Sequence, residues 1–106
     1  MTHSTMTHST VIHDATTTAL KAIRAERERQ ERLREEGRFS HTAATDGATD
    51  LECYAMLGEE FGEVGRAIQE SLRSVTDIHD VSLRKELIQV AAIATAWVER
   101  LDRSSK

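Results

Sequence analysis

Apolar residues recur at steps of three and four along the middle of the chain, which is the spacing of one face of an α-helix. This pattern predicts a helix over residues 50–73, and Thr49 followed by Glu52 has the form of a capping box that would start it. The face expected to be buried consists of Tyr54, Leu57, Phe61, Val64, Ile68 and Leu72.

Two further helices are predicted, one on each side of the first. Residues 14–36 contain neither proline nor glycine, and Gly37 suits the position after a helix C-terminus. The third helix should begin at a cap formed by Asp80 or Ser82 and run to about Leu101. Its expected buried face consists of Leu83, Leu87, Val90, Ala94, Trp97 and Leu101. Nothing resembles a β-hairpin, so the predicted fold class is all-α, a bundle of three main helices per chain.

The composition indicates that one chain makes a poor core. A chain of 106 residues buries only about two thirds of its unfolded surface, and it has one Trp, one Tyr and two Phe to fill the interior. Hydrophobic residues make up 39% of the sequence and charged residues 30%, which suits a helical protein in water. We therefore expect oligomerisation to complete the bundle.

Charge and cysteine content narrow the class of protein. The net charge of −4 argues against general nucleic-acid binding, which needs a concentrated positive surface. The single cysteine, Cys53, is expected to be a buried, reduced thiol. No apolar run reaches the roughly 20 residues of a membrane span, and the N-terminus lacks the order of a signal peptide. The expected location is the cytoplasm, with no membrane partner.

The chain begins with a direct repeat of the five residues MTHST. Residues 1–13 are expected to form a disordered tail, followed by one helical domain over 14–106. His3, His8 and His13 recur every five residues, which would scatter them around a helix, so a solvated tail is favoured over a metal site.

Acidic residues are concentrated on the second and third predicted helices. Glu59, Glu60 and Glu63 lie within one helical turn, and Glu86 and Gln89 repeat a step of three. An antiparallel hairpin through residues 74–80 would set the two groups side by side. Carboxylates that converge in this way repel one another unless a cation joins them, and oxygen ligands favour Mg²⁺, Mn²⁺ or Ca²⁺. The alternative is a solvated helix face carrying ordinary glutamates.

Three glycines accompany the acidic residues on the second helix. Each costs about 1 kcal/mol relative to alanine inside a helix. Their presence therefore suggests a packing reason, and we expect Gly58, Gly62 and Gly65 to let another helix backbone approach beside the carboxylates.

The order EEFGE (59–63) and then ELIQ (86–89) resembles the EExxE and ExxD motifs of the all-α nucleotide pyrophosphohydrolases, the MazG-like and dimeric dUTPase superfamily. ERERQ (26–30) and LRKELIQVAAIATAWVE (83–99) are similar to segments of the short MazG-like proteins of phages and actinobacteria. The resemblance covers roughly residues 20–102. It departs at Gln89, which stands where the motif has a metal-binding aspartate.

This resemblance implies a homodimer or homotetramer that hydrolyses a nucleoside triphosphate to the monophosphate and pyrophosphate. Glu60, Glu63 and Glu86 would hold Mg²⁺, or Mn²⁺, with Gln89 in the fourth motif position. Glu59 and Glu63 would be the catalytic carboxylates, with Glu59 orienting the attacking water or adding a further ligand.

Other residues are candidates for direct contact with the substrate. Arg27 and Lys85, with Arg24 and Arg84 as alternatives, are expected to offer positive charge to the phosphates, and Trp97 either stacks on the base or packs between helices. A second function stays open, because Gln89 lacks the charge of an aspartate. In it, the same pocket binds a nucleotide without hydrolysing it.

Overall fold

The computed structural model describes residues 8–39, 42–73 and 78–104; at 8–10 and 78–81 it describes only the helical backbone. Three α-helices make up most of this region: α1 (His8–Glu35), α2 (Asp50–Arg73) and α3 (Ile78–Ser104). No strand occurs in the described ranges, which confirms the all-α prediction. None of the three helices has a stretch, over the residues described, that is long and apolar enough to cross a membrane.

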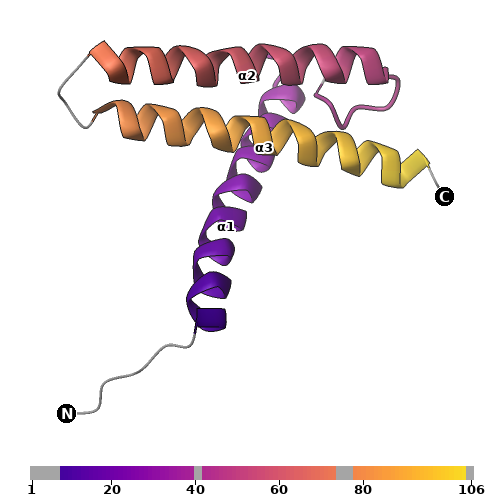
Figure 1. Ribbon diagram of the computed structural model, residues 1–106. Coiled ribbons are helices and arrows are strands. Elements are labelled where there is room, and N and C mark those ends of the chain that lie inside the picture. The colour runs from indigo at the N-terminus through magenta and orange to yellow at the C-terminus, as the bar shows by residue number, and fades with distance from the viewer. Residues whose placement is uncertain (1–7, 40–41, 74–77, 105–106) are drawn as a thin grey trace.

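The helices α2 and α3 form an antiparallel hairpin, and α1 crosses α3 steeply (Figure 1). The second half of α1 packs against α3, whereas its first half extends away from the hairpin. The hairpin was predicted from the sequence and is confirmed. The turn at 74–77 and the first seven residues of the MTHST repeat lie outside the described residues.

Local sequence signals set the ends of α1 and α2 as predicted. Gly37 follows α1 with a φ of 78°, and the amide of Arg38 donates to the carbonyl of Leu33 at 2.9 Å, a Schellman ending. At the start of α2, the amide of Glu52 donates to Oγ1 of Thr49 at 3.1 Å. Both ends depend on residues within one turn, which is why the sequence alone identifies them.

Three expected boundaries are wrong. The first helix begins at His8, so residues 8–13 are helical and not part of a disordered tail; no glycine or proline interrupts the helix there. The third helix begins at Ile78 and ends at Ser104, beyond the expected limits, so Ser82 lies inside it and is not its cap. Asp80, the other expected cap, also lies inside the helix and is not its cap.

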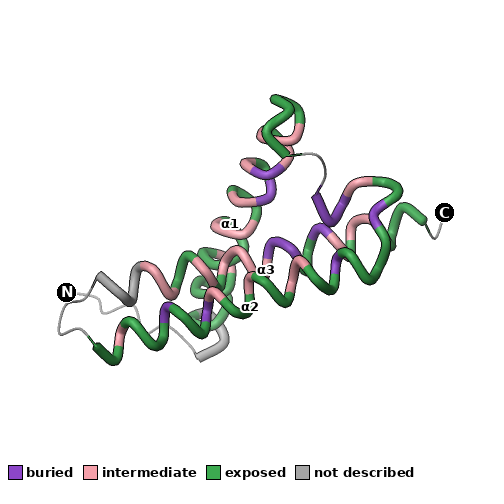
Figure 2. The backbone as a smooth tube through the Cα atoms, turned by 90° about the horizontal axis from the view of Figure 1, so that it is seen from above, coloured by how far each residue is buried: buried purple, intermediate pink, exposed green. Residues whose placement is uncertain are grey.

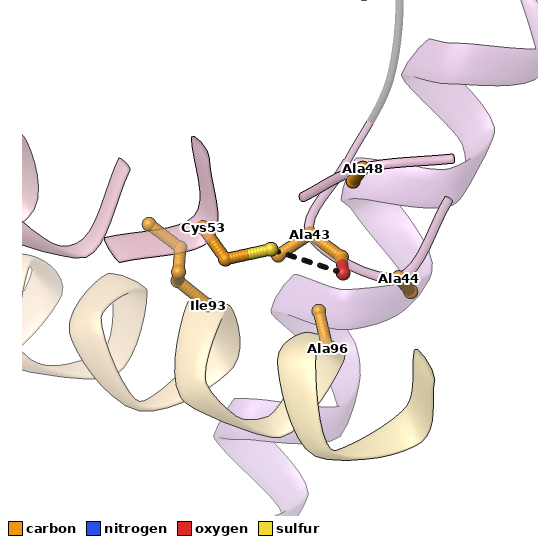
Figure 3. Packing of buried hydrophobic residues seen from close by; sticks show 6 residues of the cluster. All are labelled: Ala43, Ala44, Ala48, Cys53, Ile93 and Ala96. Carbon is orange, nitrogen blue, oxygen red and sulfur yellow. Dashed lines mark hydrogen bonds between the residues drawn. The ribbon is translucent and has the colours of Figure 1, made fainter. Parts of the chain in front are cut away.

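The core lies where the loop between α1 and α2 folds against the start of α2 and the second half of α3 (Figure 3). Cys53 is fully buried there, as predicted, and its thiol donates to the carbonyl of Ala43 at 3.6 Å. Small side chains let the loop approach α3 closely. The buried cluster consists of Ala43, Ala44, Ala48, Cys53, Ile93 and Ala96, with Met56, Leu57 and Trp97 packed against it.

The predicted buried faces of α2 and α3 are largely wrong. On α2, Tyr54, Phe61 and Leu72 are 67%, 68% and 82% exposed, and only Val64 of the predicted face is buried. The inner face of α2 is instead made by Cys53, Val64 and Ala67, and that of α3 by Ala92, Ile93 and Ala96. Small side chains, not the large apolar ones, therefore face the partner helix within the chain, and much of the hairpin stays exposed (Figure 2).

Candidate functional site

An acidic groove of about 670 Å³ runs along the hairpin between α2 and α3. The α2 side contributes Glu59, Glu60 and Glu63, and the α3 side contributes Glu86 and Gln89. The structure thus brings together every residue that the sequence assigned to the metal and catalytic roles. It does so because the hairpin sets the two acidic segments level, as the helical rise requires.

Within the groove, three of these side chains are in direct contact. With its amide nitrogen facing the carboxylates, Gln89 donates to Oε2 of Glu60 and to Oε2 of Glu86, each at 3.0 Å. All three side chains are half-buried. The amide thus bridges carboxylates from two helices, and its hydrogens offset part of their mutual repulsion.

This arrangement changes the acidity of Glu60. Burial raises the pKa of Glu60 first, and a hydrogen bond with Glu86 together with the negative charges of Glu86, Glu63 and Glu26 raises it further, from 4.5 to about 7. Near pH 7, therefore, the carboxyl group of Glu60 is partly protonated, unless a bound cation displaces the proton.

Glu63 and Glu59 lie at the outer part of the groove. Glu63 is half-buried and pairs with Arg66, whose Nη1 lies 3.2 Å from each carboxylate oxygen. Glu59 is exposed. The sequence reasoning missed Arg66, although its position three residues after Glu63 is a helical ion-pair spacing that indicates the contact.

The expected role of the glycines is wrong for the described chain. A Cβ added at Gly58, Gly62 or Gly65 would meet no atom of the structure within 4 Å. No helix backbone of the described residues therefore approaches them. Gly58 and Gly62 line the groove instead, where the missing side chains leave open space beside the carboxylates.

Arg27 does not reach the groove. It is buried at the contact between α1 and α3, where Nε donates to Oε2 of Glu99 at 2.8 Å and Nη2 lies 2.9 Å from Glu31. A guanidinium held by two carboxylates has little capacity left for phosphate. Within the described chain, Arg27 therefore lies apart from the acidic groove, and its role in phosphate binding stays a prediction.

Trp97 and Lys85 also lie apart from the groove lining. The indole of Trp97 packs on the core cluster, and its Nε1 donates to Oδ1 of Asp50 at 2.9 Å, so Trp97 joins α3 to the start of α2. This is the helix-packing alternative raised from the sequence, not base stacking. Lys85 is exposed on α3, and Arg84 beside it is exposed as well.

The oxygen atoms of the groove could hold Mg²⁺ only together with waters and substrate phosphates. Within the described part of the chain, no three histidine, cysteine, aspartate or glutamate side chains gather closely enough to hold a metal ion. Mg²⁺, however, is usually held by one or two carboxylates and completes its shell with waters and substrate phosphates. Glu60 and Glu86, with the amide oxygen of Gln89 if its amide turns over, supply this kind of set, and Mn²⁺ accepts the same ligands.

Comparison of the chain with protein family models, with curated proteins and with solved structures finds no match. The resemblance to the MazG-like proteins therefore rests on the sequence motifs EEFGE and ELIQ and the segments beside them.

Proposed function

We propose that the protein is a Mg²⁺-dependent nucleoside triphosphate pyrophosphohydrolase of the MazG-like type, which releases a nucleoside monophosphate and pyrophosphate. The observation that carries this proposal is the contact of Glu60 on α2 and Glu86 on α3 with one amide, that of Gln89. The two motif segments, which are distant in sequence, thus meet in one groove, and the high pKa of Glu60 is typical of a place suited to a cation.

In this proposal, Glu60 and Glu86 hold the metal, with Gln89 and Glu63 beside them. Bound Mg²⁺ would neutralise the negative charge of the phosphates. Glu59, exposed on the groove rim, orients a water molecule and accepts its proton as the water attacks the α-phosphorus. The bond from the α-phosphorus to the bridging oxygen of the β-phosphate then breaks, and pyrophosphate leaves.

The test is pyrophosphate release from the common nucleoside triphosphates with Mg²⁺ and with EDTA. Glu86→Gln removes one charge at the bridged pair, and we expect its turnover to fall about 100-fold or more while its helical circular dichroism is retained. Glu70→Gln is the matched control, because Glu70 is exposed on α2 and outside the groove lining. Full activity of Glu86→Gln, or equal activity in EDTA, would contradict the proposal.

A second function is favoured by the orientation of Gln89. Gln89 already bridges Glu60 and Glu86 and lacks the negative charge of an aspartate, so it would hold a divalent cation more weakly, which suits a protein that binds nucleotides without cleaving them. Nucleotide binding without pyrophosphate release from any triphosphate would support this alternative.

We further propose that a second copy of the chain covers the exposed apolar face of α2. This face carries Leu51, Tyr54, Phe61, Ile68 and Leu72, all of them exposed. The chain exposes 7973 Å², whereas a compact monomer of 11.9 kDa exposes about 6,000 Å². The chain is thus less compact than a folded monomer of its mass, and Gly65 on the same side of α2 leaves room for a close helix.

A further inference from the structure

A small cavity of about 220 Å³ adjoins the acidic groove on the side of α1. Its apolar walls come from Phe39 after α1, Met56 on α2 and Ile93 on α3. Glu59, Glu60 and Gln89 line both the cavity and the groove. A ligand whose charged end lies in the groove can therefore place its other end in this cavity.

The volume limits what fits. Ligand pockets for whole drug-sized molecules are usually about 300–1,000 Å³, so the cavity is too small for an entire nucleotide. A cavity of about 150 Å³ is known to hold benzene. At 220 Å³, the cavity has room for one six-membered ring with its substituents, and because the cavity is open on one side, a fused two-ring system would leave its second ring partly outside the apolar walls.

The polar groups suit a neutral ring with carbonyl and N–H groups. Gln30 is buried, and its Nε2 lies 3.4 Å from Oε2 of Glu26, a long contact that engages at most one of the two amide hydrogens. Another hydrogen can then donate to a ring carbonyl. Glu26 accepts two hydrogen bonds from Arg29 at 2.9 Å, and a carboxylate has further lone pairs that can accept from a ring N–H.

The charge of the residues that line the cavity decides which end of a nucleotide can enter it. Three carboxylates, those of Glu26, Glu59 and Glu60, line the cavity, and Arg29 is committed to one of them. A phosphate in the cavity would meet repulsion without the cation that is proposed to bind in the groove, whereas an aromatic base is uncharged and can stack on Phe39.

We propose that this cavity receives the base of the nucleotide and selects pyrimidine over purine nucleotides. The inference rests on the proposed function for the position of the phosphates. The selectivity comes from the size of the cavity between Phe39, Met56 and Ile93, and Gln30 and Glu26 contact the edge of the ring.

The experiment compares kcat/KM for pyrophosphate release from CTP, UTP and their deoxy forms with that from ATP, GTP and their deoxy forms. We expect at least about a tenfold preference for the pyrimidines, because a second fused ring exceeds the space available. Equal rates for purines would overturn the assignment of the cavity and leave the proposed function standing.

Two variants locate the preference in the cavity. Met56→Trp fills the space and should lower kcat/KM for pyrimidines at least about tenfold, and Phe39→Ala removes an exposed wall and should lower it several-fold without disturbing the core. The control is Val98→Ala, at an exposed position of α3 outside the cavity lining. Unchanged kinetics in both cavity variants, with intact folding by circular dichroism, would contradict the proposal.

A separate measurement covers the case in which no nucleotide is cleaved. Saturation-transfer NMR with cytidine, uridine, adenosine and guanosine tests the cavity without any phosphate. Signals from the two pyrimidine nucleosides that disappear in Met56→Trp support the cavity even if the proposed hydrolysis fails. Signals of equal strength from all four nucleosides, or no signals at all, overturn it.

Discussion

The carboxyl group of Glu60 lies half-buried between α2 and α3, in contact with the amide of Gln89 and hydrogen-bonded to Glu86. Its pKa of about 7 means that the folded chain holds a proton which the unfolded chain releases near pH 4.5. The free energy of unfolding therefore falls as the pH rises from about 4.5 to 7. Above that range it stays lowered, because the ionised carboxylate of Glu60 is less favourable in the folded chain than in the unfolded one.

Glu60→Gln should remove this dependence on pH. Without divalent metal, we expect the variant to be more stable than the natural chain by about 1 kcal/mol at pH 8, a value reduced for the partial exposure of the group, and equally stable at pH 4. Urea unfolding followed by circular dichroism in EDTA over pH 4–8 measures this difference. If the two chains showed the same difference at both pH values, Glu60 would not be the group responsible.

At the scale of the elements, Arg27 joins α1 to α3. Its guanidinium contacts Glu99 on α3 twice, at 2.8 and 3.2 Å, and it also donates to Gln30 at 2.9 Å. Burial lowers the pKa of Arg27, but contact with the carboxylates of Glu99 and Glu31 outweighs this effect and raises the pKa further, so the guanidinium stays ionised. Because Gln30 lies at the edge of the small cavity, this contact also positions a residue of the proposed base site.

Replacement of Arg27 should affect stability. Arg27→Met leaves Glu99 and Glu31 without this partner, and we expect a loss of about 2 kcal/mol in the free energy of unfolding, with a smaller loss for Arg27→Lys, which keeps the charge but not the paired geometry. Chemical denaturation measures both. A variant of unchanged stability whose KM for nucleotide rises would instead restore the role in phosphate binding that the sequence suggested.

At the scale of the whole molecule, the apolar face of α2 stays exposed in the described chain. The radius of gyration of 17.1 Å exceeds the value of about 13 Å expected for a compact domain of this length. The projecting half of α1 adds exposed Val11, Ile12 and Leu20. Exposed apolar surface of this extent is the basis of the proposed association with a second copy of the chain.

A charge on this face should separate the subunits. Phe61→Glu places a carboxylate among the exposed apolar side chains of α2, and we expect a shift from dimer or tetramer to monomer by sedimentation velocity. Arg38→Glu, at an exposed position of the loop after α1, is the control and should leave the assembly intact. A natural chain that sediments as a monomer at all concentrations would remove the proposed interface.

The buried faces of the helices could not be predicted from the hydrophobic pattern of the sequence alone. The helix α2 has large apolar residues on one side and small ones, Cys53 and Ala67, on another, and the pattern alone favoured the large ones. Within the chain, small side chains face α3 and the loop, since they allow a close approach. Periodicity identifies a helix, but it cannot say which of two apolar faces packs inside one subunit.

The part of the candidate site that depends on local spacing was predicted, and the part that depends on contacts between distant segments was not. The spacing of Glu60, Glu63, Glu86 and Gln89 placed them in one groove, because helical rise and a hairpin fix their levels. Glu26 and Arg66 were missed as neighbours of the groove, and the pairing of Arg27 with Glu99 was not predicted because the two lie 72 residues apart. Contacts of this range leave no periodic trace in the sequence.

By itself, the sequence determined the helical class, the Thr49 and Gly37 helix ends and the level of the acidic residues, since each follows from hydrogen bonds and spacing within a few turns. Only the tertiary structure decided which faces are buried, which carboxylate Arg27 meets and how far the pKa of Glu60 rises. Those properties depend on which distant segments exclude water from a side chain, and packing alone sets that.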